Sequence, residues 1–98
     1  MDVTQLTEEM HRFVEAKGWY DPQTPKPQTA RNLAASLVIE ATEVLELYQW
    51  SDEHAQKEML AGELADVALY LLQLASICGI DLERAILQKL EANYKRAW

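Results

Sequence analysis

Two pairs of carboxylates occupy the most apolar parts of this 98-residue sequence. Glu40 and Glu43 lie in the stretch LVIEATEVLELYQW, and Glu63 and Asp66 lie in the stretch GELADVALYLLQL. Each pair is spaced at i and i+3, which places both side chains on one face of a helix, one turn apart. Two such helices packed together bring four carboxylates around one point. Oxygen ligands of this kind are typical of a site for a hard cation, Mg²⁺ with Mn²⁺ as a substitute.

Two simpler explanations of these acids are a solvated helix face and a set of buried salt bridges. At about 100° per residue, Glu63 falls between Leu74 and Tyr70 at the centre of an apolar stripe, which argues against a solvated face. Salt bridges need basic partners, and residues 32–83 hold ten acids and one base, Lys57. Because an unpaired carboxylate in apolar surroundings is costly, a bound cation accounts for the pattern better. Solvated faces are expected instead for four other acids: Glu46, Asp52, Glu53 and Glu58.

The remaining side chains narrow the choice of metal. A di-iron bundle uses Glu-x-x-His on two helices, and the one such spacing here, Glu8 with His11, lies on a different helix from the carboxylates. We expect His11 to be a surface or helix-packing residue. Zinc is disfavoured because neither His nor Cys accompanies the cluster. Magnesium held by carboxylates usually acts on phosphates, so a phosphate-bearing substrate is expected.

The spacing Glu40-x-x-Glu43, nineteen residues, then Glu63-x-x-Asp66 resembles the signature of the MazG-like all-α nucleoside triphosphate pyrophosphohydrolases. The segments RNLAASLVIEATEVLELYQW and GELADVALYLLQLASICGIDLERAILQKLEANYKR are similar to the dCTP pyrophosphatase-like branch of that superfamily. The resemblance implies a hydrolase that uses Mg²⁺ to convert a nucleoside triphosphate, such as dCTP or a modified dNTP, to the monophosphate and pyrophosphate. Its implied role is house-cleaning of the nucleotide pool.

In this resemblance the four carboxylates match the metal ligands of the family. The implied mechanism uses the bound cation to neutralise charge and to align a water with the α-phosphorus, so that pyrophosphate leaves as a metal-bound anion. One of the ligands, Glu40 or Glu43, is the candidate catalytic base. The sequence does not choose between them.

Four further positions match residues that line the nucleotide pocket of the relatives: Trp50, Tyr70, Lys89 and Asn93. Considered by themselves, Lys89, Asn93 and Arg96 share one helix face and suit a phosphate or sugar contact. Lys89 and Arg96 also suit the end of a helix, where a basic side chain opposes the helix dipole. A substrate-binding role and a purely structural role therefore both remain open for these residues.

Aromatic and basic residues elsewhere extend the candidate substrate site. Trp19 and Trp50 suit stacking on a nucleobase, with core or interface packing as the alternative. Tyr70 lies on the carboxylate-bearing stripe, where its hydroxyl needs a polar partner such as a metal ligand or the substrate. Arg31 and Lys26 lie near the proline-rich loop and are further candidates for phosphate contacts.

Four helices are expected to position these residues. Their approximate bounds are residues 2–17, 30–49, 51–78 and 82–96, with a proline-rich loop at residues 20–29 between the first two. Gly18 and Gly79 are expected to end the first and third helices. Ser51 or Asp52 is expected to cap the third helix and Asp81 the fourth. With short links and no strand pattern, these elements predict an all-α protein, a four-helix bundle forming one domain over residues 1–98.

Composition limits the classes of protein that this sequence fits. A net charge of −7 disfavours binding to nucleic acid polymers and to anionic membranes. The first residues lack the basic and apolar segments of a signal peptide, and no uninterrupted apolar run reaches the roughly 18 residues of a membrane span. The single cysteine, Cys78, fits a reducing compartment. A cytoplasmic protein is therefore expected.

The apolar content also bears on assembly. Hydrophobic residues make up 49% of the chain, and the expected third helix is apolar around most of its circumference. Such a helix must be buried on all sides, which predicts a homodimer or homotetramer with the pocket near the subunit interface. Two other function classes remain open. One is a non-catalytic helical oligomerisation or partner-binding module with a structural cation, and the other is a di-metal oxidase.

Overall fold

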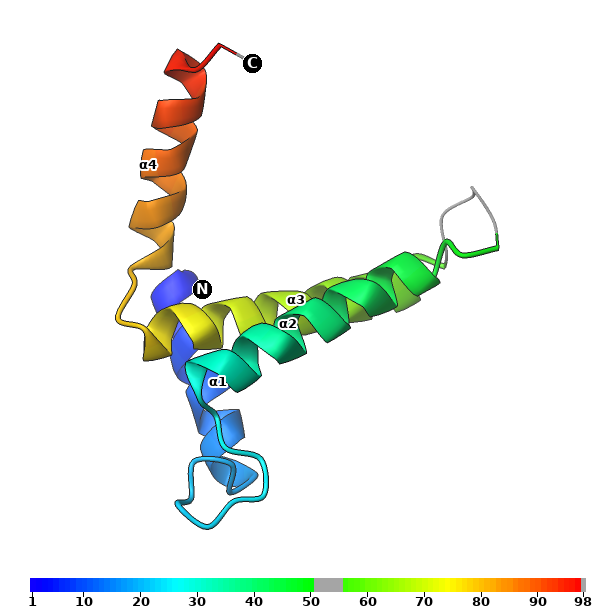
Figure 1. Cartoon of the computed structure of the whole chain (residues 1–98), viewed down its shortest axis with the longest axis vertical. Coiled ribbons are helices and arrows are strands. Elements are labelled where there is room, and N and C mark those ends of the chain that lie inside the picture. The colour runs from blue at the N-terminus through cyan, green and yellow to red at the C-terminus, as the bar shows by residue number, and fades with distance from the viewer. Residues whose placement is uncertain (51–55, 98) are drawn as a thin grey trace.

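Figure 1 shows the computed structural model of the chain, in which residues 1–50 and 56–97 are described. These residues form four α-helices, α1 (Val3–Ala16), α2 (Ala30–Glu46), α3 (Lys57–Ile77) and α4 (Leu82–Lys95). No strand occurs among them, and the expected all-α architecture of four helices is confirmed. The expected cap at Ser51 or Asp52, the acid Glu53 and the last residue, Trp98, lie outside the described residues.

Local side-chain hydrogen bonds set three of the four helix starts. Asp2 accepts a hydrogen bond from the backbone nitrogen of Gln5 at 2.8 Å, and the Gln5 side chain accepts one from the Asp2 backbone nitrogen at 2.9 Å. This reciprocal capping box satisfies two donors at the start of α1. Thr29 caps α2 by accepting from the backbone nitrogen of Asn32 at 3.2 Å. Asp81 caps α4 in the same way, as the sequence predicts.

The helix ends follow the sequence in two cases and differ in a third. Gly18 and Gly79 adopt φ values of 76° and 68°, the left-handed conformation that glycine permits, and they end α1 and α3 as expected. Helix α2 ends at Glu46, three residues before the expected end at residue 49. The backbone nitrogens of residues 47–49 bond three residues back rather than four, which tightens this segment into turns.

The packed part of the chain is a three-helix arrangement. Helices α2 and α3 lie antiparallel and side by side, and α1 crosses against α3 (Figure 1). The buried apolar side chains are contributed by all three helices: Met10, Val14, Leu33 and Ala75. The loop between α1 and α2 runs from the end of α1 back to the start of α2 (Figure 1). Helix α3 therefore contacts both α1 and α2.

Helix α4 projects from the end of α3 and does not complete a closed bundle within one chain (Figure 1). It has no buried residue, and Leu87 is 61% exposed. The radius of gyration is 15.8 Å, whereas a compact chain of this length has about 12.6 Å. The sequence identifies the apolar face of α4 by its periodicity, but periodicity does not determine which surface covers that face.

Among the described residues, α3 is the one helix that is long and apolar enough to cross a membrane by length and composition. A single helix of this kind is weak evidence for a membrane protein, because the core helix of a soluble protein has the same composition. Helix α3 also carries Glu63 and Asp66 near its middle. A charged side chain at the centre of a bilayer costs about 2.5–3.5 kcal/mol by insertion scales, which disfavours a spanning position.

Candidate active site

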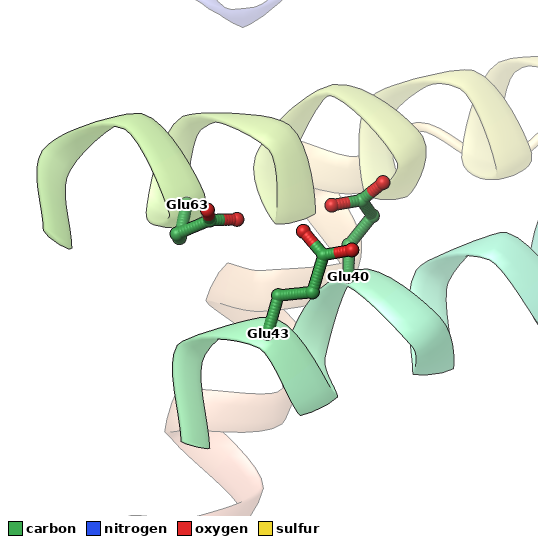
Figure 2. Close-up of side chains that lie close together, drawn as sticks. All are labelled: Glu40, Glu43 and Glu63. Carbon is green, nitrogen blue, oxygen red and sulfur yellow. The ribbon is translucent and has the colours of Figure 1, made fainter. Parts of the chain in front are cut away.

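Three of the four predicted carboxylates meet between α2 and α3. Figure 2 shows Glu40 and Glu43 projecting from α2 towards Glu63 on α3. One oxygen from each residue lies within 4.8 Å of the other two. The i, i+3 spacing aligns the two α2 residues on the face that packs against α3, as the sequence predicts. The arrangement offers three carboxylate oxygens to one divalent cation.

The electrostatics of this cluster favour a bound cation. Partial burial raises the pKa of Glu40 above its ordinary value, and the negative charges of Glu43, Asp66 and Glu63 raise it further. The pKa of Glu63 is also raised, first by partial burial and then by its contacts with Glu43. Glu40 Oε2 and Glu63 Oε2 are shielded from solvent and have no hydrogen-bond partner. Shielded acceptors without donors suit a metal ion, which supplies the missing positive charge.

Asp66 stands beside the cluster rather than within it. It lies one turn along α3 from Glu63, and its side chain is more exposed than the three clustered glutamates. Its charge contributes to the raised pKa of both Glu40 and Glu63. Asp66 also lines the cavity next to the cluster, together with Glu40. It is therefore placed to act on a ligand that extends from the three-carboxylate centre into that cavity.

An open cavity of about 400 Å³ adjoins the carboxylates, between α1 and α3. Its lining combines apolar and aromatic side chains with a few polar groups: Leu6, Glu9, Met10, Phe13, Val14, Trp19, Glu40, Asp66, Leu69, Tyr70 and Gln73. Pockets for small ligands in proteins have this size and this mixture of an apolar wall with a few polar groups. Apolar and aromatic side chains line one part of the cavity, and Glu40 and Asp66 line another. This arrangement suits a ligand that has an aromatic part and an anionic part bound through a cation.

Two of the predicted substrate residues, Trp19 and Tyr70, line this cavity. Trp19 is held by Phe13 in an edge-to-face contact with ring centroids 5.6 Å apart. The ammonium group of Lys26 lies 5.2 Å from the centroid of the Trp19 ring, a cation–π contact. Contacts on two sides fix the indole in place, so the structure supports Trp19 as part of the pocket wall.

The other predicted substrate residues lie apart from the cavity. Trp50 is 89% exposed and follows the end of α2. Lys89, Asn93 and Arg96 belong to α4 or to its C-terminal cap, and α4 projects away from the α2–α3 pair in Figure 1. Asn93 Oδ1 is nevertheless shielded from solvent and has no hydrogen-bond partner. Within a single chain these residues and the carboxylates are not brought together, and their role in binding stays a prediction.

A hydrogen-bonded network at the end of the cavity is absent from the sequence-based predictions. His11 bonds Tyr20 through Nδ1 at 2.6 Å and Ser76 through Nε2 at 2.7 Å, so it has the helix-packing role that was one of the two expected for it. Gln73 Nε2 lies 3.3 Å from the Tyr20 hydroxyl and 2.8 Å from Gln28 Oε1. Burial raises the pKa of the Tyr20 hydroxyl, which therefore keeps its proton. The sequence signal for this network is a polar residue, Gln73, within an apolar helix.

Fold and site together define an all-α protein with a cluster of three carboxylates beside a largely apolar cavity. The chain belongs to the MazG-like family, whose model matches residues 35–97. A crystal structure of a pyrophosphatase from Archaeoglobus fulgidus superposes with a TM-score of 0.81 and 31% sequence identity, covering 94% of this chain and 88% of that chain. The family resemblance expected from the sequence is therefore confirmed.

Two curated relatives have more specific names. The chain is 33% identical over 93 residues to dCTP pyrophosphatase 1 of Rattus norvegicus, a match that covers 86% of this chain and 52% of the relative. It is 47% identical over 38 residues to a dATP/dGTP diphosphohydrolase of Salmonella phage PMBT28, which covers 39% of this chain and 13% of the relative. The chain thus spans about half the length of the dCTP pyrophosphatase that it matches.

Proposed function

We propose that this protein hydrolyses deoxynucleoside triphosphates to the monophosphate and pyrophosphate with a divalent cation, Mg²⁺ or Mn²⁺. The observation that carries the proposal is the three-carboxylate centre of Glu40, Glu43 and Glu63 beside an aromatic-lined cavity. The carboxylate centre would hold the cation that a triphosphate needs, and the aromatic-lined cavity would take the nucleoside. The names of the relatives, dCTP pyrophosphatase and dATP/dGTP diphosphohydrolase, support the same reaction class.

In this mechanism the chain positions both ends of the substrate. A bound cation would neutralise phosphate charge and lower the pKa of a bound water. Glu40, Glu43 and Glu63 would hold the cation, and Asp66 would face the substrate from the adjacent cavity wall. Of the two candidate bases, Glu40 is favoured over Glu43 because Glu40 also lines the cavity. Trp19 and Tyr70 contact the nucleoside and exclude water from it.

The exposed apolar surface supports a homo-oligomer, a dimer or a dimer of dimers. The accessible surface is 7814 Å², whereas a compact monomer of 11.2 kDa exposes about 5,700 Å². The excess of about 2,100 Å² is within the range of obligate subunit interfaces. Within one chain, only 11% of the apolar 18-residue stretch of α3 is buried. We propose that a second copy covers α3 and α4 and brings Lys89 and Asn93 to the carboxylate centre.

The remaining proposals concern the unit and its setting. We propose that residues 1–98 act as one domain, in the cytoplasm, without binding nucleic acid polymers or membranes. The acidic net charge of −7 supports the last two points, because phosphate backbones and anionic lipids repel such a surface. A free nucleotide would be accepted despite this charge because a cation held by the carboxylates would invert the local field.

A product assay tests the proposed reaction. Canonical and modified deoxynucleoside triphosphates are incubated with the purified protein and Mg²⁺, Mn²⁺ or a chelator, and monophosphate, pyrophosphate and orthophosphate are measured separately. We expect pyrophosphate with either metal and none with the chelator. Release of orthophosphate in steps, or no turnover of any nucleotide, would show that the protein has a different function, such as a partner-binding module with a structural cation.

A further inference from the structure

The wall of the cavity includes a buried amide. Gln73 is 3% exposed and is the only buried polar side chain among the described residues. It lines the cavity seven residues along α3 from Asp66, which is about 10 Å at 1.5 Å per residue. A ligand that reaches from the carboxylates along this wall would therefore place its far end beside Gln73. A buried amide needs hydrogen-bond partners, and those of Gln73 determine which way it faces.

The orientation of Gln73 is fixed by a backbone carbonyl at the other end of a short chain of hydrogen bonds. Gln28 Nε2 donates to the carbonyl oxygen of Lys26 at 2.7 Å. A carbonyl oxygen only accepts, so the Gln28 amide must direct its nitrogen there and its oxygen towards Gln73. Gln28 Oε1 then accepts from Gln73 Nε2 at 2.8 Å. Reversing the Gln73 amide would place two oxygens against each other.

The second hydrogen of Gln73 Nε2 is also used. It points to the Tyr20 hydroxyl oxygen at 3.3 Å. Tyr20 accepts this bond, and its oxygen also lies 2.6 Å from His11 Nδ1, while His11 Nε2 lies 2.7 Å from Ser76 Oγ. Both hydrogens of the Gln73 amide are thus directed at neighbouring side chains. Its oxygen, Oε1, remains as an acceptor without a described partner.

We propose that Gln73 Oε1 recognises the nucleobase and favours bases that carry an exocyclic amine, cytosine and adenine, over their keto counterparts. The inference rests on the proposed function, because it places the nucleoside in the cavity. An amino group at this position donates to Gln73 Oε1. A keto oxygen at the same position faces another acceptor, and the Gln73 hydrogens are held by Gln28 and Tyr20. One lost hydrogen bond of this kind lowers kcat/KM by about 10- to 100-fold.

Matched substrate pairs test this inference with minimal change in shape. dCTP and dUTP differ by amine against keto oxygen, as do dATP and dITP. We expect wild-type kcat/KM to favour the amine of each pair by about 10-fold or more. In Gln73→Leu the ratio should fall towards one, mainly because the amine substrates become poorer.

Two further variants separate recognition from folding. Gln28→Leu removes the anchor of the Gln73 amide without changing a buried side chain, and it should lower the amine-to-keto ratio in the same direction. Ser76→Ala is the matched control, because it removes only the far end of the network, beyond His11. Its ratio should equal that of the wild type. Circular dichroism and melting temperature confirm that each variant is folded.

Binding of the monophosphates distinguishes this inference from the proposed reaction. Calorimetric titration of dCMP and dUMP requires no turnover, and we expect dCMP to bind about 10-fold more tightly in the wild type and to lose this advantage in Gln73→Leu. Equal affinities, equal kcat/KM values within both pairs, or ratios unchanged by both Gln variants would overturn the role of Gln73, and pyrophosphate release would still stand. Selective dCMP binding without any triphosphate hydrolysis would overturn the reaction and retain the base site.

Discussion

Replacing Glu40 by glutamine tests whether the carboxylates form a cation site. The side chain keeps its shape and loses its charge. One oxygen of Glu40 lies within 4.8 Å of an oxygen of both Glu43 and Glu63. Two unit charges at that separation repel by about 0.9 kcal/mol in water and more in a less polar setting. Because Glu40 is partly exposed, solvent screening keeps the sum for both neighbours at about 1–2 kcal/mol.

The metal-free protein should therefore become more stable when Glu40 is replaced. For a domain of this size about 1 kcal/mol corresponds to 4–8 °C in melting temperature, so metal-free Glu40→Gln should melt roughly 4–16 °C above the wild type at pH 7.5. The pKa of Glu40 is raised in the folded protein, so the folded state binds more protons than the unfolded state above the ordinary pKa of 4.5. The stability that Glu40 contributes to the wild type is therefore fully present below pH 4.5 and is lost as the pH rises through the raised pKa of the folded state. The difference between the two proteins should accordingly vanish near pH 4.5.

The assay is a set of thermal melts from pH 4.5 to 8, each with a chelator and with Mg²⁺ or Mn²⁺. Cation should raise the wild-type melting temperature at pH 7.5 and have a much smaller effect on Glu40→Gln, because the variant has lost a ligand. Glu46→Gln is the matched control: it lies on the same helix, is exposed, and is outside the three-carboxylate centre. Its charge is the last of the causes that raise the pKa of Glu63, so Glu46→Gln should change the metal-free melt less than Glu40→Gln. Identical metal-free melts for wild type and Glu40→Gln, with equal gains from cation, would refute the assignment of this cluster as a metal site.

Three further outcomes are expected. Glu63→Gln and Asp66→Asn should each lower pyrophosphate release by at least about 100-fold and leave the circular dichroism spectrum unchanged. The reason is that even residues outside the ligand sphere of a metal contribute about 10- to 100-fold to activity. Wild-type turnover in Glu63→Gln would exclude a role for Glu63. Trp19→Ala should raise KM by about 10-fold with a smaller change in kcat, since stacking on a base contributes about 1–3 kcal/mol, and an unchanged KM would place the base elsewhere. Leu87→Glu should dissociate the oligomer in light scattering and lower turnover together with it; a wild-type protein that is a fully active monomer near 11 kDa would contradict the assembly.

The parts of the fold that the sequence predicts are those that local chemistry determines. Asp81 caps α4 and Gly79 ends α3 because each acts on backbone groups within one turn of itself. The end of α2 is different. Residues 47–49 have apolar and polar side chains compatible with a helix, yet they form turns. Side-chain type alone does not distinguish an α-helical turn, in which backbone bonds join residues four apart, from a tighter turn, in which they join residues three apart.

The site follows the same division between local and long-range information. Glu40, Glu43 and Glu63 meet because helical periodicity places them on facing sides of two sequence-adjacent helices. The cavity beside them depends on how α1 crosses α3, and that crossing is set by packing far from the carboxylates. Gln73 was missed for this reason, although a polar residue inside the apolar run LYLLQLA is itself an indication of a buried contact.

The distribution of charge gives a physical reason for expecting a second copy at the active site. Residues 32–83, which include the three-carboxylate centre, contain ten acids and one base, Lys57. A triphosphate bound there gains positive charge from the cation, but its outer phosphates need basic side chains as well. In the same chain Lys26 is held over the Trp19 ring. Lys89 and Lys95 lie on α4, and this helix extends away from the α2–α3 pair (Figure 1). The same helix exposes the apolar residues Leu87 and Leu90. One contact between copies that covers this apolar face and brings Lys89 near the carboxylates therefore satisfies two requirements that a single chain leaves unmet.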